Sequence, residues 1–337
     1  MTIRKVLTFR ASSIGDALMA KYFLEQIHEK YPNARYGIIV ANRGAMIRDL
    51  LSAYPWIEVI EANRKSIQSL WHLWKRFHES DIVLTQYAGK GGGAFSMPSK
   101  LMARVLAVRA GLVGFIDSSS WNTYLYDTLV PIDIARAPRL LETDALVARG
   151  IPIAQSVPTL LSIPHEHIFS THTITKGEYV VVHLFAGSLG RGMSQEKRQA
   201  LLDVLADALP ERTLIVTGSA TECPYLEKLS LPKNAKNLSG KLSLQELITL
   251  IRESKGMVSI GTGPSHIASH VGTKVIVLVT CIGVPWCAED QFGPHAGYIF
   301  TRTDLCCGHH DLSRQPPICI EEIDVNNVAK KAKELFS

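Results

Sequence analysis

Several features that would restrict the function of this chain are missing from its sequence. No apolar run among the 337 residues is long enough to span a bilayer as a helix. No G-x-G-x-x-G follows a strand-like run, which argues against NAD or FAD as a ligand. There is also no dense stripe of Lys and Arg of the kind that binds nucleic acid, and no nucleophile motif. Because hydrophobic residues make up 46% and charged residues 20%, we expect a folded protein.

The first residues pass directly into a strand-like pattern, without an apolar segment of the signal-peptide type. This pattern predicts a cytoplasmic protein. The net charge of +5 is unevenly distributed, since residues 1–150 carry 19 Lys+Arg against 13 Asp+Glu. A basic first half favours an anionic substrate or a membrane surface as its partner. The plainer alternative is that the excess only keeps the protein soluble.

Short apolar runs alternate with longer amphipathic stretches along the whole chain. The strand-like runs are 6–9, 36–40, 59–60, 81–85, 112–115, 179–184, 213–217, 256–260 and 274–279. This alternation predicts the α/β class, with two Rossmann-like doubly wound domains whose parallel sheets face a central cleft. We place the domains at residues 1–160 and 175–322, with a linker near 155–178. A final helix within 323–337 follows, for which packing back on the N-terminal domain is one option.

Polar residues gather in the loops that follow the predicted strands. After the first strand come Ser13 and Asp16, and a carboxylate there suits removal of a proton from a substrate hydroxyl. The alternative is that Asp16 stabilises the start of a helix. After strand 179–184 come Gly187, Ser188 and Arg191, which suit a diphosphate or, alternatively, form a solvated surface loop.

Two further loops complete the candidate site. Glu222 follows strand 213–217 and suits a ribose hydroxyl, or else it belongs to the first turn of a helix. Gly261, Thr262, Gly263 and His266 lie between strand 256–260 and a predicted helix. Such a junction exposes backbone N–H groups and the positive end of the helix dipole, so it favours phosphate.

In this order, the loops resemble those of glycosyltransferase family 9, the ADP-heptose:lipopolysaccharide heptosyltransferases and their relatives. The matching segments are 10–16, 187–188, 191–196, 218–222, 238–247 and 261–268. The resemblance implies a GT-B fold and an inverting, metal-independent glycosyltransferase. It also implies that the C-terminal half binds a nucleotide sugar, by default ADP-heptose. The N-terminal half would bind an anionic glycan or lipid acceptor of cell-envelope biosynthesis.

The resemblance also implies roles for individual residues. Asp16 would be the general base and Arg191 the cation that faces the leaving diphosphate. The other donor-binding residues would be Gly187, Ser188, Glu222, Leu242, Gly261, Thr262, Gly263 and His266. For the acceptor, the residues themselves suggest Ser13, Arg64, Lys65, Gly91 and Gly92, because basic side chains suit an anionic acceptor and glycines let it approach the backbone closely.

Two positions depart from the family pattern. Gly261 stands where the family has Asp, and Arg191 stands where it has Lys. Alternatives therefore stay open: transfer of another sugar to a protein or capsule acceptor, or a nucleotide-sugar-binding protein without turnover.

Five of the six cysteines follow position 280. In a cytoplasmic protein we expect them to be reduced. An alternative is a structural zinc or iron ion held by Cys306, Cys307, His309 and Cys319. The transfer reaction itself is expected to require no cofactor.

The segment 66–78 carries an apolar stripe that includes Ile67, Leu70, Trp71, Trp74 and Phe77. We expect this stripe to pack into the core of the protein. The alternative is peripheral contact with the inner membrane.

Overall fold

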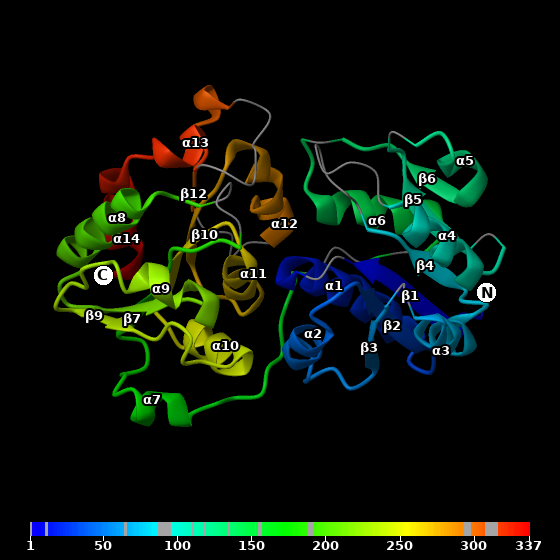
Figure 1. The fold of residues 1–337 in the computed structure, drawn as a ribbon, viewed down its shortest axis with the longest axis horizontal. Helices are drawn as coiled ribbons and strands as arrows, with labels where there is room; N and C mark the ends of the chain where they lie inside the picture. Colours follow the sequence, from blue (N-terminus) through cyan, green and yellow to red (C-terminus); the bar gives the residue numbers. More distant parts are fainter. Residues whose placement is uncertain are drawn as a thin grey trace. The chain divides into compact units, whose positions relative to one another are not determined.

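Each half of the chain folds as a parallel β-sheet with helices on both faces (Figure 1). The computed structural model describes residues 2–10, 13–63, 66–86, 96–109, 111–117, 119–133, 135–151, 153, 157–187, 192–292, 298–306 and 316–337. The chain divides into unit 1, Met1–Ser156, and unit 2, Val157–Ser337. In the described part of the chain, no helix has the length and apolar character of a membrane span.

The sheet of unit 1 has the strand order β3-β2-β1-β4-β5-β6. Its strands are β1 (Lys5–Arg10), β2 (Arg35–Val40), β3 (Ile57–Glu61), β4 (Ile82–Leu84), β5 (Leu112–Phe115) and β6 (Thr128–Val130). All pairs are parallel, and Val6 of β1 lies between Tyr36 and Ile82. β1 and β2 are buried along nearly their whole length, because helices cover both faces of a parallel sheet.

The helices of unit 1 are α1 (Ile14–Lys30), α2 (Gly44–Leu50), α3 (Ile67–Phe77), α4 (Met97–Leu106), α5 (Asn122–Leu125) and α6 (Pro138–Ala148). Helix α3 contacts the sheet through Leu73 and Phe77, and the Phe77 ring lies against Gly37 of β2. Ile67, Trp71 and Trp74 are exposed, to 85%, 51% and 46%. The expectation that the whole apolar stripe of this helix packs into the core was therefore wrong. A helix can turn only one face to the sheet, and the stripe is wider than that face.

The sheet of unit 2 has the strand order β12-β11-β10-β7-β8-β9. Its strands are β7 (Tyr179–His183), β8 (Thr213–Thr217), β9 (Ala235–Asn237), β10 (Gly256–Ile260), β11 (Val275–Leu278) and β12 (Tyr298–Phe300). The longer helices are α8 (Gln195–Ala208), α10 (Leu244–Arg252), α11 (Gly263–His270) and α14 (Val325–Phe336). Shorter turns are α7 (His167–Thr171), η2 (Ala220–Glu222), α9 (Cys223–Leu226), η3 (Cys281–Trp286), α12 (Glu289–Phe292), η4 (Thr303–Leu305) and α13 (Ile318–Glu321).

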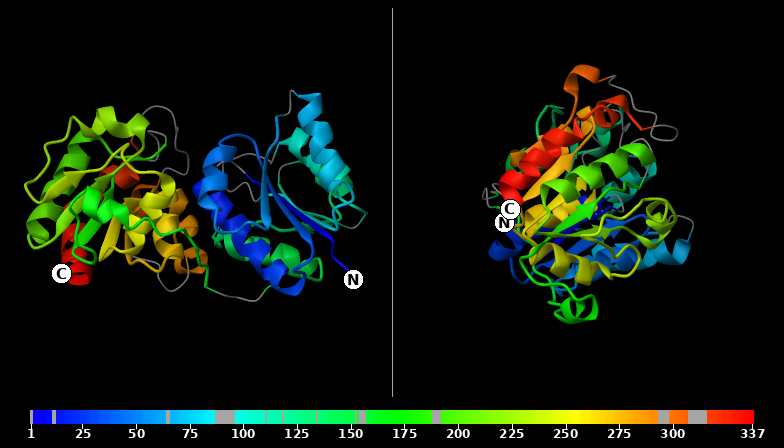
Figure 2. Two further views of the ribbon diagram at one scale, coloured as in Figure 1. Left: turned by 90° about the horizontal axis from the view of Figure 1, so that it is seen from below. Right: turned by 90° about the vertical axis from the view of Figure 1, so that its left-hand side faces the viewer.

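The last helix, α14, packs beside α8 in unit 2 (Figure 2). Its buried residues Val328, Ala329, Ala332 and Phe336 belong to the core of this unit. The Phe336 ring occupies the space above Gly256 of β10, where a Cβ atom would lie 2.1 Å from the ring. This corrects the option that the helix packs back on the N-terminal domain, since its apolar face is filled within its own unit.

Most of the segment that the sequence suggested as a linker is also bound to unit 2. The Leu160 N–H donates to the His270 carbonyl at 2.8 Å, and Arg252 donates to the Leu160 carbonyl at 3.1 Å. Further along, the N–H groups of Ile163 and His165 donate to the Gln245 and Thr249 side chains. The segment therefore packs against α10 and α11 and belongs to unit 2.

The two sheets have the same topology. In each, the first strand of the unit lies in the middle, next to the fourth, so the chain order reverses between these two strands. The predicted α/β class with two doubly wound Rossmann-like domains is confirmed. In such sheets, ligands bind outside the carboxyl ends of the strands at the point of reversal. In unit 1 this point lies between β1 and β4, and in unit 2 between β7 and β10.

Candidate active site

The point of reversal in unit 1 holds Asp16. This residue lies in the first turn of α1, directly after β1, and its side chain reaches Gln86, which follows β4. Gln86 Nε2 donates to Asp16 Oδ1 at 2.8 Å, and Ser13 Oγ donates to Asp16 Oδ2 at 2.5 Å. These two hydrogen bonds hold the carboxylate at the carboxyl edge of the sheet, where a substrate of unit 1 is expected.

Asp16 also has the structural role that the sequence suggested as an alternative. The Ser13 hydroxyl accepts from the Asp16 N–H at 3.2 Å, so the two residues cap the start of α1 together. The two roles are compatible, because each carboxylate oxygen has two lone pairs and can accept from a second donor. Asp16 is only 7% exposed. The predicted residues Asp16 and Ser13 are thus brought together in one arrangement.

Behind Asp16 lies a buried ion pair that sequence reasoning did not find. Arg10, at the end of β1, donates to both carboxylate oxygens of Glu142 in α6, at 2.9 and 2.5 Å. Both side chains are fully buried. The pair fixes the end of β1 relative to α6 and so supports the loop from which Asp16 emerges. Arg10 was already part of the matched segment 10–16, but the sequence gives no sign of its partner 132 residues away.

The point of reversal in unit 2 holds the segment from Gly261 to His266. Gly261 follows β10, and its N–H donates to the Leu278 carbonyl of β11 at 2.8 Å. A Cβ atom on Gly261 would lie 2.9 Å from Val279 Cγ2 and 3.3 Å from Cys287 Sγ. The first carbon of any side chain at this position would therefore meet a Val methyl group and a Cys sulfur. The departure from the family pattern is built into the packing around it.

The start of α11 is partly satisfied by its own residues. Ser265 and His266 donate their N–H groups to the Thr262 carbonyl at 3.1 and 3.4 Å, and Pro264 has no N–H. The Ser265 hydroxyl accepts from the Thr262 N–H at 3.2 Å. This turn thus has fewer backbone donors left for an anion than its sequence pattern predicts.

His266 is buried, and its ring packs against Phe292 with the ring centroids 4.9 Å apart. Burial lowers the pKa of its imidazole to about 4. The ring is therefore neutral near pH 7, so it can donate one hydrogen bond but brings no positive charge to the site.

Glu222 caps the turn in which it lies. Its Oε2 atom accepts from the Ser219 N–H at 2.6 Å and from the Ser219 hydroxyl at 2.9 Å. Its role in the first turn of a helix, one of the two alternatives from the sequence, is thus present in the structure. Leu242 is half-buried, directly before Ser243, the capping residue of α10.

Two buried basic residues of unit 2 were missed by sequence reasoning. His183 is the last residue of β7, paired with Ser259 of β10, and its Nδ1 atom lies 3.2 Å from Thr217 Oγ1. Arg198 of α8 is 7% exposed and its guanidinium lies 4.9 Å from the centre of the Phe185 ring. Burial lowers the pKa of both. The Glu222 carboxylate opposes this shift in His183, and the carboxylates of Glu321 and Glu222 oppose it in Arg198. Arg198 is therefore a cation beside the loop that follows β7.

Several predicted site residues lie outside the described part of the chain. They are Arg191 and Ser188 of the proposed donor loop, Arg64, Lys65, Gly91 and Gly92 of the proposed acceptor site, and Cys307 and His309. Gly187, which directly precedes Ser188, is among the described residues and is exposed. For these residues the proposed roles rest on the sequence.

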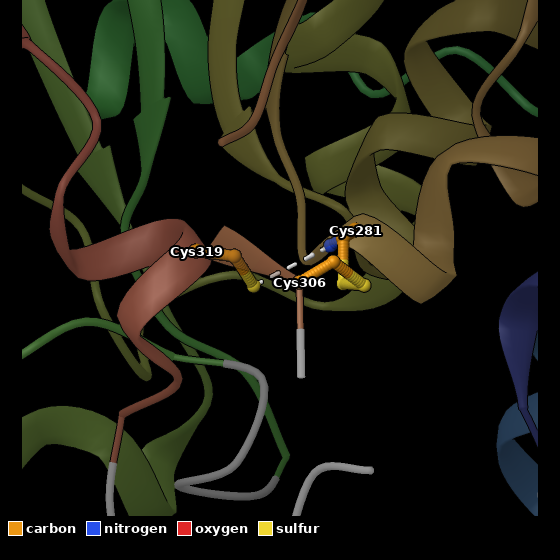
Figure 3. The surroundings of a disulfide bond; sticks show 3 residues. All are labelled: Cys281, Cys306 and Cys319. Atoms are coloured by element: carbon orange, nitrogen blue, oxygen red, sulfur yellow. Dashed lines mark hydrogen bonds between the residues drawn. A yellow bond between two sulfur atoms is a disulfide. The ribbon is translucent and has the colours of Figure 1, made fainter. Parts of the chain in front are cut away.

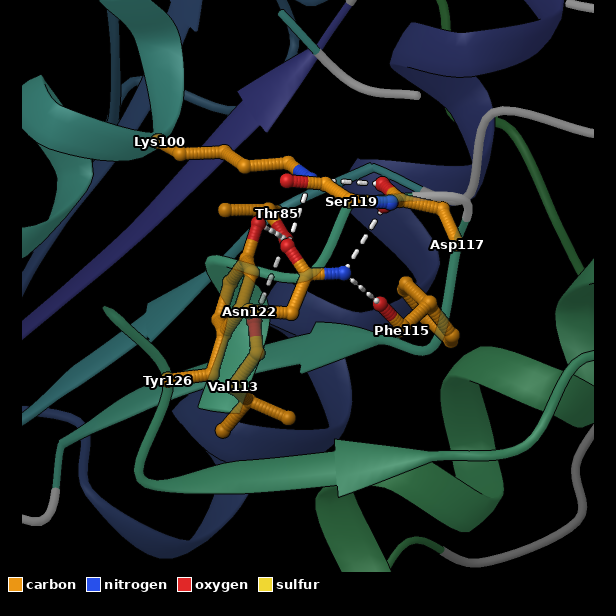
Figure 4. Close-up of polar contacts among 8 residues, drawn as sticks. All are labelled: Thr85, Lys100, Val113, Phe115, Asp117, Ser119, Asn122 and Tyr126. Atoms are coloured by element: carbon orange, nitrogen blue, oxygen red, sulfur yellow. Dashed lines mark hydrogen bonds and ion pairs between the residues drawn. The ribbon is translucent and has the colours of Figure 1, made fainter. Parts of the chain in front are cut away.

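Lys100, one of the basic residues in the first half of the chain, is buried in a polar network (Figure 4). Its Nζ atom donates to Asp117 Oδ2 and to Asn122 Oδ1, both at 2.6 Å. The Lys100 ammonium, hydrogen-bonded to Asp117, holds the pKa of that carboxyl below its usual value, although burial opposes this effect. The charge of Lys100 is therefore already paired. Its hydrogen bonds to Asp117 and Asn122 fix the start of α4 to the segment that follows β5.

The late cysteines are not all reduced, which corrects the expectation from the sequence. Cys281 and Cys306 form a disulfide, with their Cα atoms 5.7 Å apart (Figure 3). They come together because each lies a few residues beyond one of the neighbouring parallel strands β11 and β12. Cys319 Sγ lies 3.5 Å from the Cys281 backbone nitrogen. Since Cys306 is bonded to Cys281, it has no free thiolate for a metal ion in this structure.

No metal-binding group of three or more His, Cys, Asp or Glu side chains occurs among the described residues. Two of the four candidate ligands, Cys307 and His309, lie outside that part of the chain. The metal alternative from the sequence therefore stays a prediction.

The comparisons with known proteins agree with the topology. Residues 203–280 match the model of glycosyltransferase family 9 (heptosyltransferase). This segment runs from α8 to the residues after β11 and includes Glu222, Leu242 and the loop from Gly261 to His266. No curated protein sequence matches the chain.

Solved structures of similar fold cover nearly the whole chain. The ADP-heptose lipopolysaccharide heptosyltransferase II of E. coli has 16% identity and a TM-score of 0.68, covering 98% of both chains. A family 9 glycosyl transferase of Veillonella parvula has 13% identity and a TM-score of 0.71, covering 100% of this chain and 98% of that one.

A third structure, the iron-containing heptosyltransferase TibC with ADP-D-beta-D-heptose, has 13% identity and a TM-score of 0.59. The match covers 99% of this chain and 76% of TibC, which comes from enterotoxigenic E. coli. At these identities the likeness shows the GT-B fold. The family match and the shared fold confirm the resemblance to glycosyltransferase family 9 and indicate a heptosyltransferase-like glycosyltransferase.

Proposed function

We propose that the protein transfers a sugar, by default heptose, from a nucleotide sugar to a hydroxyl of an anionic glycan or lipid acceptor in the cytoplasm. The observation that carries this proposal is the family match over 203–280, because it includes the loops that follow β8 and β10 at the carboxyl edge of the sheet in unit 2. The donor would bind there, against Glu222, Leu242 and the segment from Gly261 to His266. The acceptor would bind at the corresponding edge of unit 1.

The proposed reaction inverts the configuration at the sugar. The Asp16 carboxylate accepts the proton of the acceptor hydroxyl, and the hydroxyl oxygen forms a bond to the anomeric carbon. The bond from that carbon to the diphosphate oxygen breaks, and the nucleoside diphosphate leaves with the electron pair. Ser13 and Gln86 orient the carboxylate through the hydrogen bonds described above.

Charge on the leaving diphosphate requires positive partners. Arg191 is proposed for this role from the sequence, and the N-terminus of α11 adds its dipole. Because burial keeps His266 neutral, its proposed part is one hydrogen bond to the donor. We propose that the transfer step needs no metal ion.

The packing around Gly261 favours a second candidate, transfer of a sugar other than heptose to a protein or capsule acceptor. A Cβ atom at this position would already meet Val279 and Cys287, and Gly261 brings no carboxylate, so we propose that the contacts to the sugar here differ from those in the family. A nucleotide-sugar-binding protein without turnover is the third outcome that this packing leaves open.

A thermal-shift panel of ADP-, GDP- and UDP-sugars tests the proposal. At about a hundred times its Kd, the true donor should raise the melting temperature of its unit by about 5 °C. Product formation with the selected donor, followed by mass spectrometry over several acceptors, then separates transfer from binding alone. If no nucleotide sugar shifts the melting temperature, the proposed donor site does not exist.

A further inference from the structure

An apolar groove lies between α3 and α4 on the surface of unit 1. It has a volume of about 490 Å³, and all nine residues that line it are apolar, among them Ile67, Leu70, Trp71, Trp74, Met102 and Val105. The two helices lie side by side on the same face of the sheet (Figures 1 and 2). Exposed apolar surface concentrated in one place on a folded protein marks an interaction site.

The exposure of these residues is high for their type. Ile67 is exposed to 85% and Val105 to 64%, and each of the two tryptophans is about half exposed, Trp71 to 51% and Trp74 to 46%. Indole rings at a half-exposed apolar surface are typical of proteins that meet the interface between lipid and water.

The charged residues of the two helices that form the groove are all basic. Neither α3 nor α4 contains Asp or Glu, while together they contain Lys75, Arg76, Lys100 and Arg104. Arg76, Lys100 and Arg104 have acidic partners on other elements, whereas Lys75 is exposed and its Nζ atom lies 5.1 Å from the centre of the Trp71 ring. The whole of unit 1 carries 19 Lys+Arg against 13 Asp+Glu. Such a unit is attracted to a surface of anionic lipid head groups.

We propose that the α3–α4 groove docks unit 1 on the surface of a bilayer that contains anionic lipid. Trp71, Trp74 and Ile67 enter the boundary between head groups and acyl chains, and Lys75 extends along the Trp71 ring to reach the head groups. The contact is peripheral, since it uses side chains of two surface helices.

The direction of the groove connects this surface with the function proposed above. In a parallel sheet, a helix that follows a strand starts at the carboxyl edge, so Ile67 and Pro98 mark the end of the groove nearest that edge. Asp16 lies at the same edge of the same unit. This step rests on the proposed function, in which a lipid is one of the two acceptor classes: the head group of such a lipid would extend from the bilayer toward Asp16.

Vesicle flotation without nucleotide or acceptor tests the proposal. The wild type should float with mixed phosphatidylcholine–phosphatidylglycerol vesicles, bind pure phosphatidylcholine weakly, and be released by salt. The variant Trp71→Gln/Trp74→Gln should bind about tenfold more weakly, because it loses two apolar side chains from the contact. Binding should shift the tryptophan emission to the blue and allow quenching by brominated acyl chains, and both signals should be lost in the variant.

The control variant Tyr225→Gln/Ile318→Gln removes two side chains of unit 2 with similar exposure, 48% and 53%. It should bind vesicles within about twofold of the wild type, a change no larger than that of ordinary surface substitutions. Equal binding by the groove variant and the wild type would overturn the proposal. So would a wild-type dimer that ignores vesicles and that the groove variant makes monomeric, because the groove would then bind a second copy. Vesicle binding without sugar transfer would contradict only the proposed function.

Discussion

At the scale of single residues, Asp16 is the group whose replacement separates catalysis from binding. Asn has the same shape and still accepts a hydrogen bond from Ser13, so Asp16→Asn should leave the fold intact while removing the base. We expect transfer to fall by about 10²–10⁴-fold, the usual contribution of a positioned base. The thermal shift with the donor nucleotide should stay unchanged, since the donor is proposed to bind unit 2. Near-normal turnover in this variant would show that another group takes the proton.

Gly261 is the residue at which local packing and the family pattern disagree. Because a Cβ atom there would lie 2.9 Å from Val279 Cγ2, Gly261→Ala should destabilise unit 2 by about 1–3 kcal/mol. The double variant Gly261→Ala/Val279→Ala removes the methyl groups nearest to the added carbon. In urea unfolding, the double variant should lose less free energy of unfolding than the sum of the two single losses, by at least about 0.5 kcal/mol. Additive effects would mean that the two side chains do not compete for the same space.

His266 makes the stability of unit 2 dependent on pH. Its folded pKa of about 4 lies below the ordinary value of 6.5, so between these values the unfolded chain binds a proton that the folded chain does not. Stability is therefore complete above about pH 6.5 and is lost as the pH falls toward 4, by roughly 3 kcal/mol in total.

Urea unfolding of the wild type and of His266→Gln, each at neutral pH and near pH 4.5, measures this contribution. The wild type should lose about 2 kcal/mol more than the variant between the two conditions. The other titrating groups are common to both proteins and cancel in the comparison. Equal losses would show that the imidazole is not held neutral by burial.

At the scale of elements, the ion pair between Arg10 and Glu142 joins β1 to α6. Glu142→Gln leaves a buried guanidinium without a negative partner and should reduce the free energy of unfolding of unit 1 by about 3 kcal/mol. The double variant Arg10→Met/Glu142→Leu replaces both charges by apolar side chains and should recover most of that loss. Denaturant unfolding of the three proteins gives the comparison. A double variant less stable than Glu142→Gln would mean that the pair itself, and not the unpaired charge, determines the stability.

The sequence predicted the buried strands at the centre of each sheet and missed three short edge strands, for a physical reason. β1, β2, β7, β8, β10 and β11 are four to six residues long and almost entirely buried, so they appear as apolar runs. By contrast, β6, β9 and β12 are three-residue strands at the edges of the sheets, and β9 contains Lys236 and Asn237. An edge strand pairs with one neighbour only and can be as short as three residues, so any apolar run that it leaves is too short to recognise.

The candidate site was also predictable only in part from the sequence. The loops after the central strands could be named from the sequence, since their polar residues follow apolar runs. The partners of those residues could not, because Gln86, Glu142 and Val279 are brought to Asp16, Arg10 and Gly261 only by strand pairing and helix packing. For the same reason, the burial of Arg198 and His183 beside these loops could not be predicted from the sequence.

At the scale of the whole molecule, both units repeat one topology but differ in charge. Unit 1 carries six more basic than acidic residues, whereas the rest of the chain is close to neutral. The same point of reversal holds a carboxylate, Asp16, in unit 1 and a glycine-containing helix start in unit 2. Under the proposed function, one fold would supply the proton acceptor from one unit and the diphosphate-binding turn from the other, a division that transfer from a nucleotide sugar needs.

This division predicts where the donor nucleotide acts on the chain. Hydrogen exchange with the best nucleotide of the panel should slow in unit 2 at residues 218–222, 242–246 and 261–266, because ligand contacts there suppress local opening. Exchange at residues 13–86 of unit 1 should stay unchanged within error. A nucleotide without a thermal shift is the matched control and should protect neither region. Protection of the segment around Asp16, with none around Gly261, would assign the donor to unit 1 and reverse the proposed roles of the two units.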